Sequence, residues 1–110
     1  MLITVKDLVP VTLTRKRGEE AFNALRARLD HQNVDVDLDG SLMLSSSFLD
    51  ELILKLAKSN LLRRVAFVTR QATTRHKLGI IAHERNLTLY SKESGSDVGS
   101  SLYRDSLGLL

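Results

Sequence analysis

The stretch VDVDLDGSLMLSSSFLDEL, residues 34–52, decides the fold. Its first part alternates the apolar residues Val34, Val36 and Leu38 with aspartates. This period of two predicts a strand with one buried face and one solvent-exposed face. Strands that are covered by helices on both faces usually read as continuous apolar runs instead. The stretch therefore predicts a sheet whose helices pack mainly on one side.

A helix is expected directly after this strand, beyond a turn at Gly40. Ser47 and Asp50 have the S-x-x-D spacing of a capping box, which predicts that the helix begins near Ser47. Hydrophobic residues then recur at helical spacing and form one wide apolar face: Phe48, Leu49, Leu52, Ile53, Leu56 and Ala57. We therefore expect an amphipathic helix that packs on the strand.

The rest of the chain continues the alternation of strands and helices. Periodicity predicts strands at residues 2–5, 11–14, 65–68 and 87–90. It also predicts a helix that is established by Glu19 and has an apolar stripe to Leu29, and a further helix capped by Thr73 or Thr74. This order predicts an α/β fold, with a small mixed sheet of about four to five strands and about three helices mainly on one face. One domain is expected over residues 1–90, followed by a polar linker and a short tail over residues 91–110.

Length and composition narrow the class of protein. A chain of 110 residues has room for one core, and the absence of cysteine excludes disulfides and thiolate chemistry. No signal peptide and no apolar run near ~18 residues is visible, so we expect a soluble cytoplasmic protein that does not enter a membrane.

The sequence contains no complete catalytic or metal-binding motif. Asp35, Asp37, Asp39 and Gly40 imitate the start of an EF-hand loop, but Ser46 stands where that loop needs a bidentate glutamate. The chain has neither a nucleophile elbow nor a glycine-rich nucleotide-binding motif. We therefore expect no catalytic residues, no metal site and no cofactor.

One segment resembles a known family. SSSFLDEL, at Ser45–Leu52, is similar to the signature of the bacterial STAS-like domain family, which is related to sulfate transporter and anti-sigma factor antagonist domains. The resemblance extends to RGEEAF at Arg17–Phe22 and to VDVDLDG at Val34–Gly40, and it covers residues 1–90. It implies a non-enzymatic regulatory module that binds a histidine-kinase-like ATPase or serine kinase.

The resemblance also implies a site. In the antagonists, a serine at the start of the second helix is phosphorylated by the partner kinase, which breaks the complex. By position that serine is Ser46, with Ser47 beside it. The docking surface would be the loop 40–47 with the helix start, and its expected contact residues are Asp37, Asp39, Ser45, Ser46, Asp50 and Glu51. Two alternatives stay open, namely docking without phosphorylation and serines that only cap the helix.

A basic segment supports a different interpretation. Residues 63–77 contain five bases and no acid, and these could bind nucleic acid in a salt-dependent way: Arg63, Arg64, Arg70, Arg75 and Lys77. Only Phe67 lies among them, so no aromatic platform for stacked bases is expected. The same charges could instead meet the acidic stretch of another copy, which would give a head-to-tail homo-oligomer.

Overall fold

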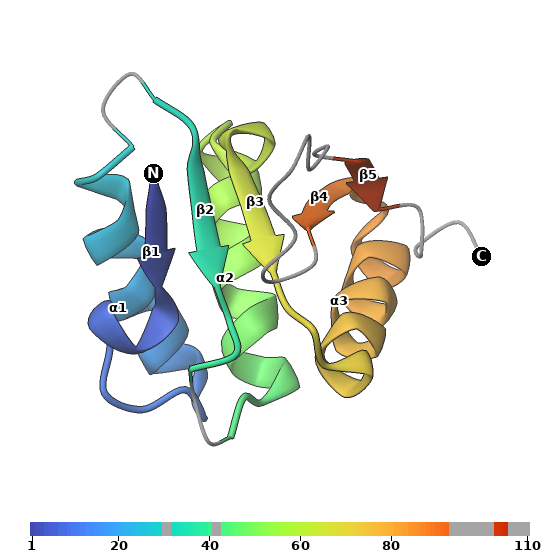
Figure 1. Ribbon diagram of the computed structural model, residues 1–110, viewed down its shortest axis with the longest axis horizontal. Helices are drawn as coiled ribbons and strands as arrows, with labels where there is room; N and C mark the ends of the chain where they lie inside the picture. Colours follow the sequence, from blue (N-terminus) through green and yellow to red (C-terminus); the bar gives the residue numbers. More distant parts are fainter. Residues whose placement is uncertain (30–31, 41–42, 93–102, 106–110) are drawn as a thin grey trace.

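Five strands form a single sheet in the order β1-β2-β3-β4-β5. They are β1 (Leu2–Thr4), β2 (Val34–Asp37), β3 (Val65–Val68), β4 (Leu89–Lys92) and β5 (Tyr103–Asp105). The first four run parallel, and β5 pairs antiparallel to β4 at one edge (Figure 1). The computed structural model describes residues 1–29, 32–40 and 43–92, and the backbone of residues 103–105.

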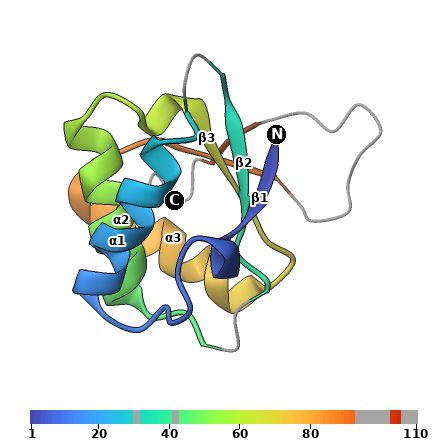
Figure 2. The same cartoon turned by 90° about the vertical axis from the view of Figure 1, so that its left-hand side faces the viewer.

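Three helices connect the parallel strands. They are α1 (Arg15–Arg26), α2 (Ser46–Lys58) and α3 (Ala72–Arg85), and two short 3-10 helices accompany them, η1 (Val5–Asp7) and η2 (Leu62–Arg64). Right-handed crossovers between strands added in one direction place every helix on the same face of the sheet. Figure 2 shows this arrangement, with all three helices on one side of the strands. The predicted α/β class, mixed sheet and one-sided helices are confirmed.

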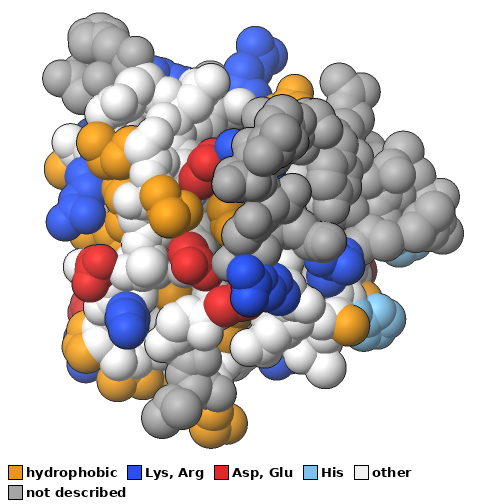
Figure 3. Space-filling view, viewed as in Figure 1, with side chains coloured by type: hydrophobic (Ala, Val, Ile, Leu, Met, Phe, Trp, Pro, Cys, Tyr) orange, Lys and Arg blue, Asp and Glu red, His pale blue; other side chains and the backbone are white. Residues whose placement is uncertain are grey.

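The alternation in β2 explains why only one face is covered. Val34 and Val36 are fully buried under the helices, whereas Asp35 and Asp37 alternate with them and are half-buried on the open face. On that open face the Lys92 Nζ lies 2.7 Å from the Asp35 Oδ2. Figure 3 views the open face and shows acidic, basic and hydrophobic side chains side by side.

The helices α1 and α2 approach one another closely at Gly18. A Cβ built on Gly18 would lie 2.6 Å from the Phe48 carbonyl oxygen and 3.3 Å from the Leu52 backbone nitrogen. Both atoms belong to one turn of α2, so only a residue without a side chain fits between the two helix backbones. This contact fixes the first turn of α1 beside the first turn of α2.

Three predicted strands differ from the observed ones. The strand predicted at residues 2–5 ends at Thr4, because Val5 begins η1. The prediction of a strand at residues 11–14 is wrong. This segment lies beside a loop, so among the described residues it has no neighbouring strand with which to form a ladder of hydrogen bonds. Its neighbour is the segment before α2, where the Ser45 N–H donates to the Thr12 carbonyl at 3.0 Å. The strand predicted at residues 87–90 begins two residues later, at Leu89, because the left-handed Asn86 that ends α3 must turn the chain first.

The C-terminal prediction is only partly covered by the described residues. The strand β4 continues to Lys92, and β5 lies within the segment predicted to be linker and tail. Residues 93–102 and 106–110 lie outside the described part of the chain, and the domain boundary at residue 90 stays a prediction. Among the helices of the described residues, none is long and apolar enough to cross a membrane.

Candidate protein-docking site

Ser45 caps α2. Its backbone is extended, and its Oγ accepts a hydrogen bond from the Phe48 N–H at 3.0 Å while donating to the Leu13 carbonyl at 2.8 Å. The predicted start at Ser47 is therefore wrong, since the helix begins at Ser46 and its cap is Ser45. The predicted capping box does not form because the other member, Asp50, is hydrogen-bonded to arginines.

Ser46 and Ser47 occupy the first turn of α2 and are exposed. Neither side chain makes a hydrogen bond within the described residues, because the capping role belongs to Ser45. Their hydroxyls stand at the end of α2 that carries unpaired N–H groups and the positive end of the helix dipole. They are thus available to a partner without loss of any bond that holds the fold.

The three serines can be separated by stability measurements. The Ser45→Ala variant is expected to lose about 1–2 kcal/mol of unfolding free energy, because it removes the cap. Ser46→Ala and Ser47→Ala are expected to stay within about 0.5 kcal/mol of wild type, as exposed substitutions away from caps do. Urea unfolding of the three variants checks this. A larger loss for Ser47→Ala than for Ser45→Ala would contradict the assignment of the cap.

Hydrogen bonds brace the loop before α2 from both sides. On the α1 side, the Thr12 hydroxyl donates to the Met43 carbonyl. On the α3 side, the Lys77 Nζ donates to the Leu44 carbonyl at 2.7 Å. Upstream, Asp39 accepts bonds from the Thr69 hydroxyl and, at 2.7 Å, from the Arg70 N–H. The described residues directly before α2 are therefore hydrogen-bonded to neighbouring segments on both sides.

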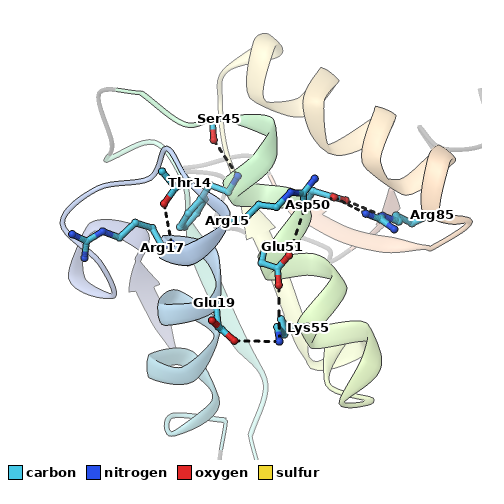
Figure 4. Close-up of polar contacts among 10 residues, drawn as sticks. Thr14, Arg15, Arg17, Glu19, Ser45, Asp50, Glu51, Lys55 and Arg85 are labelled. Atoms are coloured by element: carbon cyan, nitrogen blue, oxygen red, sulfur yellow. Dashed lines mark hydrogen bonds and ion pairs between the residues drawn. The ribbon is translucent and has the colours of Figure 1, made fainter.

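Asp50 joins all three helices. Its carboxylate accepts two hydrogen bonds from Arg85, at 2.7 and 3.0 Å, and one from the Arg15 Nη1 at 2.8 Å. Arg15 reaches it from α1 and Arg85 from α3, as Figure 4 shows. The bonds from Arg85 and Arg15 lower the pKa of Asp50 below its ordinary value, although burial opposes the shift. Asp50 is therefore an ionised, internally paired group.

Glu51 takes part in the same network. Its carboxylate lies 3.5 Å from the Arg15 Nη1 and 4.0 Å from the Lys55 Nζ, which in turn lies 3.3 Å from Glu19 (Figure 4). The acids of α2 thus face bases of this chain. Their negative charge is largely compensated before any partner arrives.

The four acids predicted to form one docking field lie in two places. Asp37 is on the open face of the sheet, and Asp39 follows it in the loop, where its N–H donates to the Asp37 Oδ1 at 2.9 Å. Asp50 and Glu51 belong to α2 on the opposite face. The structure brings Ser45 and Ser46 together with Asp50 and Glu51, but not with Asp37. The contact of these residues with a partner stays a prediction.

The five predicted nucleic-acid contacts also divide into two groups. Arg63 and Arg64 lie in η2, before β3, while Arg70, Arg75 and Lys77 follow β3 and enter α3. The central strand β3, four residues long, separates the groups by about 13 Å, so they lie at opposite ends of this strand. No single basic groove forms from these five side chains.

Sequence reasoning missed Arg15 and Arg85. Each is 35 residues from Asp50, and no spacing rule links positions so far apart. One signal did point to Arg15. The first turn of α1 contains three consecutive bases and no acid, although the positive end of the helix dipole favours acids there. Such a local conflict indicates that at least one base has a tertiary partner.

The candidate docking site is exposed surface at the start of α2 and is not part of a crevice in the sheet. The strand order runs without reversal, so the sheet has no switch-point crevice of the kind at which open α/β sheets bind small ligands. Within the described residues, no group of three His, Cys, Asp or Glu side chains could hold a metal ion. No family model, no curated protein and no solved structure matches this chain.

Proposed function

We propose that this chain is a non-enzymatic regulatory module that binds a partner protein through the loop 40–47 and the first turn of α2. The observation that carries the proposal is that, within the described residues, only one of the three serines has a structural role. Ser45 supplies the helix cap, while Ser46 and Ser47 stand exposed with no hydrogen bond of their own in the described structure. A purely structural role thus accounts for Ser45 and leaves its two neighbours unexplained.

The partner in this proposal is an ATPase or kinase with a histidine-kinase-like fold, in the bacterial cytoplasm. It follows from the resemblance of SSSFLDEL to the STAS-like and anti-sigma factor antagonist domains. Ser46 is the residue that such a kinase would phosphorylate. Its exposure at the start of α2 supports this role, because a kinase can reach it without unfolding the helix.

Phosphorylation would act through charge. A phosphoserine carries about −1.5 to −2 charges at neutral pH. A partner fitted to a neutral hydroxyl would have to bury this charge, which is costly without new compensating bonds. In this chain Arg15 and Arg85 already hold Asp50, so neither is released to neutralise the phosphate without breaking that cluster. Modification of Ser46 is therefore expected to release the partner.

The test is recovery of the tagged chain from the organism that encodes it, followed by intact-mass analysis and peptide mapping. We expect one phosphate on Ser46 and co-recovery of a histidine-kinase-like ATPase. The Ser46→Ala variant should lose the phosphate, and Ser46→Asp should lose the ATPase. Ser59→Ala changes an exposed serine at the other end of α2 and should change neither. An unmodified chain recovered without an ATPase would rule out the proposal.

A further inference from the structure

Exposed apolar side chains gather beside the start of α2. Six large hydrophobic residues are exposed in the described part of the chain, and three of them come from two adjoining segments: Val11 at 40%, Leu13 at 43% and Met43 at 66%. Single exposed hydrophobic residues are ordinary on protein surfaces, whereas contiguous apolar patches mark interaction sites. The hydrogen bond from the Thr12 hydroxyl to the Met43 carbonyl places these three residues on adjoining segments. These three residues are called the loop patch below.

The loop patch is held in place by hydrogen bonds between its two segments and the start of α2. Thr12, between Val11 and Leu13, is buried, and its hydroxyl donates to the Met43 carbonyl. Ser45 donates its N–H to the Thr12 carbonyl at 3.0 Å and its hydroxyl to the Leu13 carbonyl at 2.8 Å. The patch therefore adjoins the capping serine and needs no rearrangement to meet a partner.

Three lysines lie beside residues that flank the loop patch in the chain or in space. The Lys6 side chain packs along Gly40, where its Cδ lies 3.3 Å from the position of an added Cβ. Lys16 is exposed in the first turn of α1, and the Lys77 Nζ donates to the Leu44 carbonyl. None of the three pairs with a carboxylate among the described residues. Their charges are therefore available to an outside ligand.

The nearby acids are in a different position. Both oxygens of Asp39 accept hydrogen bonds, from the Thr69 hydroxyl and the Arg70 N–H. Asp50 is held between two arginines. Carboxylates that are already hydrogen-bonded attract an incoming base less than unpaired lysines attract an incoming acid. The lysines beside the loop patch are consequently better placed than these acids to attract an oppositely charged group.

We propose that the loop patch and the lysines around it bind an acidic, amphipathic segment of the partner protein. The inference rests on the proposed function and specifies the chemistry of its partner. Apolar residues of the segment would cover the loop patch, and its carboxylates would meet Lys6, Lys16 and Lys77. A protein fits better than a nucleic acid, because the patch is aliphatic and offers no aromatic ring for bases to stack on.

A hollow next to Met43 gives this segment a point of entry. Its volume is about 210 Å³, and it lies between the loop before α2 and the start of α3. Its lining includes Met43, Thr73 and Lys77. The Lys77 ammonium uses one N–H on the Leu44 carbonyl and keeps two further donors. A carboxylate of the segment would find donors there.

A displayed library of random 16-residue peptides, selected on the full chain, tests the inference. Enriched peptides are expected to combine Asp or Glu with Leu, Ile or Phe at helical spacing. Leu13→Ser and Met43→Ser should each weaken binding about tenfold, as loss of an interface anchor does. Ile80→Ser changes an equally exposed hydrophobic residue on α3 and should leave binding unchanged. Far-ultraviolet circular dichroism verifies that each variant is folded.

Charge variants complete the test. Lys16→Glu is expected to weaken binding at low salt, whereas Lys58→Glu, at the far end of α2, should not. The inference would be overturned if basic peptides were enriched or if no peptide were enriched. It would also be overturned if neither Leu13→Ser nor Met43→Ser changed the binding affinity. Salt-sensitive binding of poly(U) RNA that ignores Leu13 would favour a nucleic acid instead. Dependence on Ser46 without dependence on Leu13 would retain the proposed function and reject only this inference.

Discussion

The Gly18→Ala variant is expected to be less stable than wild type by about 1–3 kcal/mol, the usual cost of forcing an extra methyl group into a well-packed contact. Helix propensity alone predicts the opposite, a gain of about 1 kcal/mol when glycine in a helix becomes alanine. The added Cβ would lie 2.6 Å from the Phe48 carbonyl oxygen and 2.9 Å from the Glu51 Cβ. Because the nearest atom belongs to a helix backbone, no side-chain rotation relieves the clash. Urea unfolding measures the sign.

Asn23→Ala is the matched control for Gly18→Ala. Asn23 is exposed in the same helix, and its replacement is expected to raise stability by a few tenths of a kcal/mol through propensity alone. If Gly18→Ala were also stabilising, α1 and α2 would not approach as closely as described. A loss that grows further in Gly18→Val would support the close contact, since a larger side chain must separate the helices more.

The second large effect is expected for Asp50→Ala, with a loss of about 1.5–3 kcal/mol, the range for hydrogen bonds to charged groups. Asp50 is 9% exposed and accepts bonds from both Arg15 and Arg85. Its removal leaves Arg85 without its acceptor and Arg15 with only the 3.5 Å contact to Glu51, and it opens a gap where the three helices meet. The arginines are partly exposed and can turn to water, which keeps the loss below that of a fully buried ion pair.

The same cluster gives stability a defined dependence on pH. Because the pKa of Asp50 is lower in the folded than in the unfolded protein, its contribution is complete above the unfolded value, near pH 4. It is lost as the pH falls from there through the folded pKa. The difference in unfolding free energy between the wild type and Asp50→Asn should therefore decrease from neutral pH to strong acid, and most steeply below about pH 4.

A control separates this cluster from ordinary surface charge. Arg17 and Glu20 form an exposed pair at 2.8 Å, and Glu20→Gln is expected to cost at most about 0.5 kcal/mol. Thermal unfolding of Asp50→Ala, Asp50→Asn and Glu20→Gln at pH 7 and pH 3 compares the two kinds of pair. Equal effects for Asp50 and Glu20 would mean that the three-helix cluster adds nothing beyond a surface ion pair.

The individual strands and helices with clear periodicity could be predicted from the sequence. The alternation of Val34 and Val36 with aspartates led to β2, to its open face and to helices on one side. The apolar spacing from Phe48 to Leu56 led to α2, whose inward residues are buried. Both patterns are short-range consequences of backbone geometry, with periods of two and 3.6 residues. Such periods are visible in one chain without any knowledge of its partners.

The site depended on contacts that no period encodes. Ser45 rather than Ser47 became the cap because Leu13, 32 residues away, offers its carbonyl to the Ser45 hydroxyl. Asp50 looked like half of a capping box, yet its partners come from α1 and α3. Residues 11–14 have the composition of a strand, but they lie beside the loop before α2 and form no strand. In each case a tertiary neighbour overrode a sound local preference.

The strand order has a consequence for how the chain folds. Each of the four parallel strands lies beside the strand that precedes it in the chain, so no pairing waits for a segment made much later. Short closures cost less chain entropy than distant ones, and topologies rich in them fold faster. The unit from β1 to β2 can thus form early, while the chain is still being synthesised. Each later strand can then pair with the outermost strand already formed.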